Sequence, residues 1–256
     1  MKIGVCCGLD NAPIAKAVGL DYAEENMSRL LLLSDKEFSD LQKQYEKIDI
    51  PVYSFNVFFG KDITIYSDDF FSSAREYAKK ALARAHALDG KICVIGSGKA
   101  RRIPEGMSYS DAEDRFVDIL KIIGEEGAKH GVKLAVEPLN RDETNFINTV
   151  GEAARIAARA GLENVASLVD FYHFNRENES DEALLAVGNS IIHTHIAAPK
   201  IRKMMTMEED IPTIEHWAGL LKEINFNTAI SIEAKYEDFE RDLRAGLDYL
   251  APFKAL

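Results

Sequence analysis

Four residues whose side chains can bind a metal or move a proton stand at the ends of four successive predicted strands. Glu137 closes KLAVE, Asp170 closes VASLVD, His195 lies in IIHTHIA, and Glu233 closes AISIE. Because the carboxyl ends of parallel barrel strands meet on one rim, these side chains are expected to lie together. Three adjacent carboxylates would repel one another and shift toward protonation unless a cation held them. The pattern predicts a metal site.

The mixture of carboxylate and imidazole ligands indicates which metal this would be. Such ligands suit one divalent ion of the Mn, Mg or Co type, whereas a structural zinc centre matches poorly without thiolates, and zinc stays a further option. Taken singly, each strand-end carboxylate would more often cap a helix. Their occurrence on four strands in order favours the metal. His193 shares a strand face with His195, which leaves it as a core residue or as a support for the ligand.

The stretch around Glu137 shows how such a side chain would be delivered. Pro138 has no backbone N–H, so the buried strand must stop at Glu137 and give way to a polar loop. A buried carboxylate needs a cation, a metal or a substrate as its partner.

The rest of the chain supplies a scaffold for these strand ends. Short β-type runs alternate with amphipathic helical runs, and a capping box is predicted at Ser110. Eight such pairs predict a (β/α)8 barrel of one domain over residues 1–256. An open doubly wound sheet is the rival, weakened because no GxGxxG turn follows the first strand. The predicted strands are 2–7, 22–25, 52–58, 91–96, 133–137, 165–170, 191–196 and 228–233, and the predicted helices are 12–18, 35–48, 70–88, 110–130, 149–160, 181–187, 213–223 and 236–252.

Composition narrows the choice of partners. The formal net charge of −11 over 256 residues argues against nucleic acid or an anionic membrane as the main partner. Three cysteines without metal-type spacing favour a reducing compartment, and we expect neither a signal peptide nor a transmembrane segment, because no apolar run is long enough. We expect a cytoplasmic protein that acts on a small molecule, and self-association into a homo-oligomer is compatible with the sequence.

Four segments together resemble a known family. EPLNRDETNFINT at 137–149, LVDFYH at 168–173, HTHIA at 193–197 and SIE at 231–233 are similar to the xylose isomerase-like barrels, which include tagatose and psicose 3-epimerases. GSGKARRIPEG at 96–106 is also similar to a stretch common there.

The resemblance implies roles for individual residues. It makes Glu137, Asp170, His195 and Glu233 the ligands of one divalent metal, and the two glutamates the acids that also move protons. It makes Glu143 and His173 substrate-binding residues. The sequence departs from the family pattern after the ligand histidine, because Ala198 occupies a position that is acidic in the 3-epimerases. Arg202 is the residue that is then expected to contact the substrate.

The implied chemistry is proton abstraction next to a sugar carbonyl through an enediolate. The substrate would be a sugar or a sugar phosphate, since the cations at 99–102 could meet a phosphate. Ketose 3-epimerisation and aldose–ketose isomerisation both remain open. A metal-dependent lyase, such as an inosose or dehydroshikimate dehydratase, and a non-catalytic sugar-binding barrel are the alternatives. A nuclease of the same architecture is disfavoured by the acidic charge.

Overall fold

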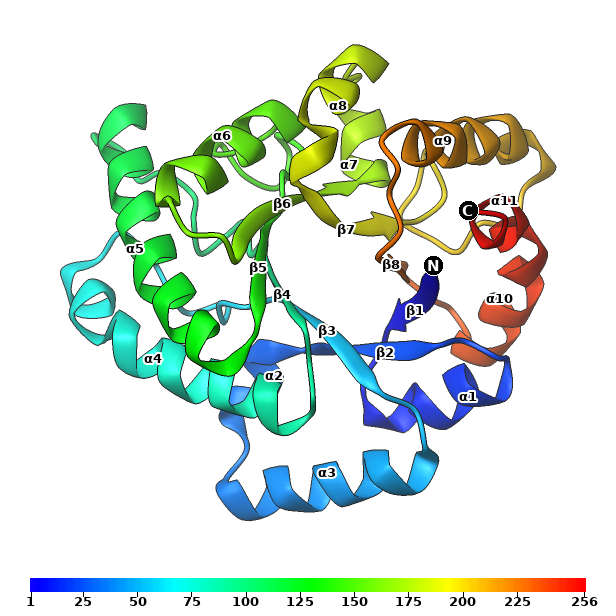
Figure 1. Cartoon of the computed structure of the whole chain (residues 1–256), viewed down its shortest axis with the longest axis horizontal. Helices are drawn as coiled ribbons and strands as arrows, with labels where there is room; N and C mark the ends of the chain where they lie inside the picture. The colour runs from blue at the N-terminus through cyan, green and yellow to red at the C-terminus, as the bar shows by residue number, and fades with distance from the viewer.

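The computed structural model describes residues 1–256 as a closed barrel of eight parallel strands in sequence order, β1 to β8, with β8 pairing back onto β1. Helices surround the barrel on the outside (Figure 1). This confirms the predicted (β/α)8 fold. None of the helices combines the length and the apolar character needed to cross a lipid bilayer.

Strands and helices alternate along the chain. The strands are β1 Lys2–Cys6, β2 Tyr22–Asn26, β3 Val52–Asn56, β4 Ile92–Ile95, β5 Lys133–Val136, β6 Val165–Asp170, β7 Ile191–Ile196 and β8 Ala229–Ile232. The helices are α1 Ala12–Ala17, α2 Met27–Leu32, α3 Asp35–Ile48, α4 Asp68–Ala87, α5 Tyr109–His130, α6 Val150–Ala160, α7 Phe171–Arg176, α8 Asp181–Val187, α9 Ile211–Glu223, α10 Phe239–Gly246 and α11 Ala251–Lys254. Four 3₁₀ turns complete the chain: η1 Leu9–Asn11, η2 Gly188–Ser190, η3 Glu208–Asp210 and η4 Leu247–Leu250.

All eight predicted strands are present, and the helical predictions need three corrections. The last predicted helix, 236–252, is broken into α10, η4 and α11. The predicted capping box at Ser110 is wrong: Ser108 is the N-cap of α5, and its side chain accepts a hydrogen bond from the Asp111 backbone N–H. Two helices, α2 and α7, follow β2 and β6 without a loop and were not predicted.

Polar side chains in the barrel strands are concentrated in β2, β3, β6 and β7, and the other strands are largely apolar. Parallel strands covered by helices are buried on both faces, so only a few polar side chains can be accommodated, and these must be hydrogen-bonded. Gly4 illustrates the tight packing, because a Cβ there would overlap the ring of Tyr22 from the neighbouring strand β2. The Tyr22 hydroxyl reaches Ser231 Oγ on β8 at 2.7 Å.

Candidate metal and proton-transfer site

Four side chains converge at the carboxyl-terminal rim of the barrel. Glu137 directly follows β5, Asp170 ends β6, His195 lies in β7, and Glu233 directly follows β8. One ligand atom from each of the four lies within 4.8 Å of the others. The structure therefore brings together all four residues that the sequence placed on one rim.

The imidazole of His195 lies at the centre of this group. Its Nδ1 atom is 2.8 Å from Glu233 Oε2, 3.2 Å from Glu137 Oε1 and 3.8 Å from Asp170 Oδ2. The ring is fully buried, and Glu137 and Asp170 are nearly so. All three carboxylates thus approach one nitrogen of one ring.

Local structure fixes each carboxylate differently. The Glu137 side chain lies over the end of β4, where a Cβ at Gly96 would overlap Glu137 Oε2, so that glycine leaves room for the carboxylate. Asp170 is also the N-cap of α7, since its Oδ1 accepts from the backbone N–H groups of Tyr172 and His173 at 2.8 and 3.2 Å. Its other oxygen faces the site. Helix capping and site formation therefore coexist in this residue.

A guanidinium group supplies positive charge to the cluster. Arg202 Nη2 donates to Asp170 Oδ2 at 2.7 Å and to Glu233 Oε2. Its Nη1 lies 2.9 Å from His173 Nε2, and its guanidinium carbon is 5.2 Å from the centre of the Tyr172 ring. Arg202 reaches two of the three carboxylates, and none of its hydrogen bonds goes to Glu137.

The acidities of the two glutamates diverge as a result. Burial raises the pKa of Glu137; the hydrogen bond and charge of His195 oppose this rise, and the neighbouring charges of Glu233 and Asp170 favour it. Burial also opposes ionisation of Glu233, but Arg202 and His195 outweigh it and hold the pKa of Glu233 below its ordinary value. Two carboxyl groups whose acidities are pushed apart are the arrangement that acid–base catalysis uses.

The predicted substrate residues lie around this cluster in different settings. His173 is buried in α7, with Nδ1 3.2 Å from the Asn140 backbone N and Nε2 beside Arg202. Glu143 is exposed on the loop after β5, and its Oε1 is 3.4 Å from Asn140 Nδ2. His173 and Arg202 thus adjoin the four rim side chains, whereas Glu143 lies farther out on a loop.

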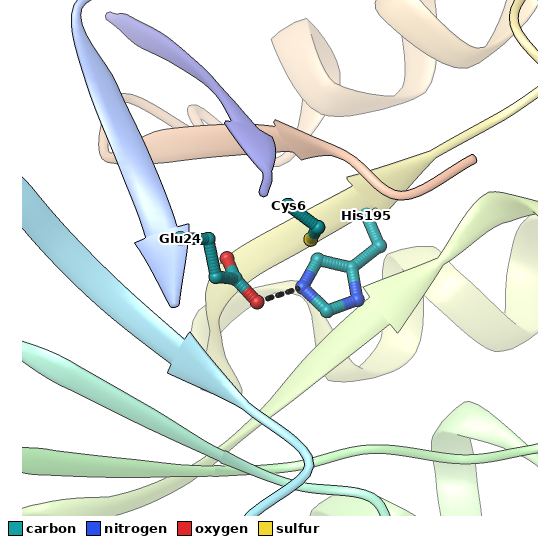
Figure 2. Close-up of side chains that lie close together, drawn as sticks. All are labelled: Cys6, Glu24 and His195. Atoms are coloured by element: carbon teal, nitrogen blue, oxygen red, sulfur yellow. Dashed lines mark hydrogen bonds and ion pairs between the residues drawn. The ribbon is translucent and has the colours of Figure 1, made fainter. Parts of the chain in front are cut away.

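Two polar side chains in contact with this cluster, those of Glu24 and Asn56, were not predicted from the sequence. Glu24 of β2 is 1% exposed, and its Oε1 is 2.9 Å from His195 Nε2, the nitrogen opposite Nδ1 (Figure 2). Asn56, at the end of β3, donates through Nδ2 to Glu233 Oε1 at 3.1 Å. The available signal was an acid inside the predicted strand 22–25, because a carboxylate in a buried strand needs hydrogen-bonding partners.

The rim residues fit a bound divalent cation. Three buried or half-buried carboxylates and one imidazole nitrogen form a donor set typical of Mn²⁺, Mg²⁺ or Co²⁺. Their close approach around Nδ1 leaves excess negative charge that Arg202 compensates only in part, since it bonds to two of the three acids. A metal held here would compete with Arg202 for oxygens of Asp170 and Glu233.

Comparison with known proteins places this geometry in context. A model of the xylose isomerase-like TIM barrel family matches residues 13–253. A probable ketose 3-epimerase from Synechocystis sp. (strain ATCC 27184 / PCC 6803 / Kazusa) is 28% identical over 190 residues, which span 71% of this chain and 63% of that protein. The D-psicose 3-epimerase of Agrobacterium fabrum is 25% identical over 226 residues, which span 84% of this chain and 75% of that protein.

A solved structure shows the same architecture. The crystal structure of the apo 3-keto-D-glucoside 4-epimerase from E. coli superimposes with a TM-score of 0.80 over the whole of both chains, at 22% sequence identity. At this identity, the likeness establishes a shared fold.

Proposed function

The chain belongs to the xylose isomerase-like TIM barrel family, and from this premise we propose that it is a divalent-metal-dependent sugar epimerase. It inverts a carbon next to the carbonyl of a ketose or keto-sugar. The observation that carries the proposal is the convergence of Glu137, Asp170, His195 and Glu233 within 4.8 Å on the barrel rim. The ketose and psicose 3-epimerase relatives support this reaction class.

The metal ligands in this proposal are the four rim residues. Mn²⁺, Mg²⁺ or Co²⁺ suits the three oxygens and one nitrogen, with Zn²⁺ as a further option. When bound, such an ion acts as a Lewis acid that polarises the sugar carbonyl and stabilises the negative charge that develops on it.

Glu137 and Glu233 are the proton-moving acids. They follow β5 and β8, three strands apart around the rim, so they can approach a bound sugar from two sides. One carboxylate removes the proton from the carbon next to the carbonyl, which leaves an enediolate. The other carboxyl group returns a proton to the opposite face, and the configuration is inverted. Burial of Glu137 keeps water from supplying that proton unselectively.

His173 and Arg202 hold the hydroxyl groups of the substrate, with Glu143 as a further contact from the loop after β5. The buried His173 is already oriented by Asn140, and Arg202 is oriented by Tyr172. Such prearranged donors reduce the entropy cost of fixing the sugar between the two acids.

Deuterium incorporation tests the reaction directly. The protein is incubated in heavy water with Mn²⁺ and a panel that contains D-psicose, D-fructose and a 3-keto-glucoside. We expect an epimer that carries deuterium at the inverted carbon, as shown by NMR and mass spectrometry. Loss of water from the sugar would instead identify a lyase, and transfer of the carbonyl to the next carbon would identify an aldose–ketose isomerase.

A sugar that binds without any exchange would contradict the proposal and favour a non-catalytic barrel. Protein stripped of metal with EDTA serves as the matched control. It should show no exchange until Mn²⁺ is restored.

A further inference from the structure

A buried hydrogen-bond network centred on Glu24 lies inside the barrel next to the candidate metal site. The carboxylate of Glu24 accepts hydrogen bonds from residues of three other strands: Ser54 Oγ at 2.6 Å, Ser231 Oγ at 2.5 Å, His193 Nε2 at 2.8 Å and His195 Nε2 at 2.9 Å. All of these side chains are fully buried. A charge so deep in the barrel requires this number of donors to be tolerated.

The two oxygens of Glu24 are used differently. Oε2 accepts from Ser54, Ser231 and His193, whereas Oε1 is bonded to His195 alone. Three partners therefore lock the carboxylate in place, and its remaining oxygen is directed at one imidazole. Figure 2 shows this bond, with the other nitrogen of the ring directed away from Glu24.

This contact decides which nitrogen of His195 faces the rim. Glu24 is an acceptor only, so Nε2 must carry a hydrogen. The ring nitrogen left for a metal is Nδ1, which is the atom that Glu137 and Glu233 approach. A carboxylate behind a metal-binding imidazole also increases the basicity of the ligand.

We propose that Glu24 is a positioning residue that holds His195 in the orientation and tautomer that present Nδ1 to the metal, a role that rests on the proposed function. His193, Ser54 and Ser231 act in turn by fixing Glu24. His193 is thus a support rather than a ligand.

A separate metal centre at Cys6, Glu24 and His195 is the competing explanation of this cluster. Their potential ligand atoms also lie within 4.8 Å of one another. However, both oxygens of Glu24 are already engaged by four donors, from Ser54, Ser231, His193 and His195. Hydrogen bonding therefore accounts for this cluster without an ion.

Metal affinity tests the role of Glu24 independently of turnover. Glu24→Gln keeps the shape and removes the charge, whereas Glu24→Leu removes the acceptor. We expect the calorimetric Kd for Mn²⁺ to rise about 10- to 100-fold in Glu24→Gln, the range typical of such supports, and at least as much in Glu24→Leu. In the Mg²⁺-loaded protein, the ¹⁵N shifts of the His195 ring, assigned with His195→Gln, should report a single Nε2–H tautomer that is lost in Glu24→Leu.

Glu25→Gln is the matched control. Glu25 is the next residue of β2 and is 2% exposed, but its carboxylate bonds to Tyr45 at 2.6 Å rather than to the site. We expect this variant to bind Mn²⁺ like the wild type. Unchanged Kd values in folded Glu24→Gln and, where it folds, Glu24→Leu would overturn the positioning role alone. A wild-type protein that binds no divalent metal would overturn the metal site of the proposed function as well.

Discussion

Two buried glutamates of equal exposure show how differently this molecule treats negative charge. Glu137 lies on the barrel rim, and Glu113 lies in α5, where its side chain faces α6. Each is 6% exposed. Arg155 and Arg159 both pair with Glu113, and Arg155 Nη2 is 2.7 Å from its Oε2. These hydrogen bonds and charges hold the pKa of Glu113 below its ordinary value despite burial, whereas burial raises the pKa of Glu137.

The difference lies in the supply of cations rather than in depth. Outside the barrel, Glu126 is likewise paired, with Arg75 and Lys129. On the rim, three acids share one imidazole and Arg202. Glu113 and Glu126 are neutralised by their basic partners, whereas the rim acids are left short of positive charge, as expected at a functional site.

Removing a rim acid should have the largest effect. We expect Glu137→Gln and Glu233→Gln each to lower kcat by about 10²- to 10⁴-fold, because each variant loses a group that moves a proton. Epimerase kinetics, with circular dichroism as a check of folding, would measure this. Glu113→Gln is the matched control and should keep wild-type kcat. Full activity in both rim variants would refute their assignment as acids.

Adding a divalent cation should have the next largest effect. For EDTA-treated protein, Mn²⁺ at about 100 times its Kd should stabilise the fold by about 2.7 kcal/mol, because the ion binds the native state. For a chain of this size, that is a rise in Tm of about 5–10 °C. Asp170→Asn should lose most of this shift in differential scanning fluorimetry. An equal shift in wild type and variant would place the ion elsewhere.

Glu113→Gln should lower stability and leave turnover unchanged, which is the reverse of the result expected for the rim variants. It leaves two arginines without their shared partner, but these are 40–49% exposed and remain hydrated. We therefore expect a loss of about 1 kcal/mol in the free energy of unfolding, since partly exposed ion pairs are weak, and unchanged turnover. Urea denaturation would measure the loss. A fall in kcat without a fall in stability would abolish the distinction between the two classes of acid.

The smallest effect is expected at Glu179, a partly buried acid outside the barrel that has no cationic partner. It accepts from the Val150 backbone N–H at 2.9 Å but has no cationic partner, and burial raises its pKa to about 7. The folded protein therefore holds this proton more tightly than the unfolded chain, and stability falls as pH rises from about 4.3 to about 7. Glu179→Gln should raise Tm at pH 8 and change it less at pH 5. A gain that is equal at both values would exclude titration of Glu179 as the cause.

The sequence was most informative where residue type and position in an element coincide. Strand ends at Glu137, Asp170, His195 and Glu233 could be located because apolar runs stop there, and the family match confirms the resemblance first indicated by these motifs. Helix α7 was missed because six residues that directly follow Asp170 are too short to show helical periodicity.

Contacts between distant segments could not be predicted in this way. Arg202 reaches Asp170 and Glu233 from a loop whose path depends on the whole barrel. Glu24 meets His195 only because closure of the barrel brings β2 opposite β7. No local pattern in a single segment reports such pairs.

The position of Arg202 also bears on the order in which the protein is assembled. Because its guanidinium already neutralises part of the acid cluster from within the chain, we expect the chain to fold without a bound ion. Small zinc-dependent domains, by contrast, are unfolded until they are loaded. We expect newly made polypeptide to reach its native shape first and to take up metal afterwards, with the arginine giving way as the ion arrives.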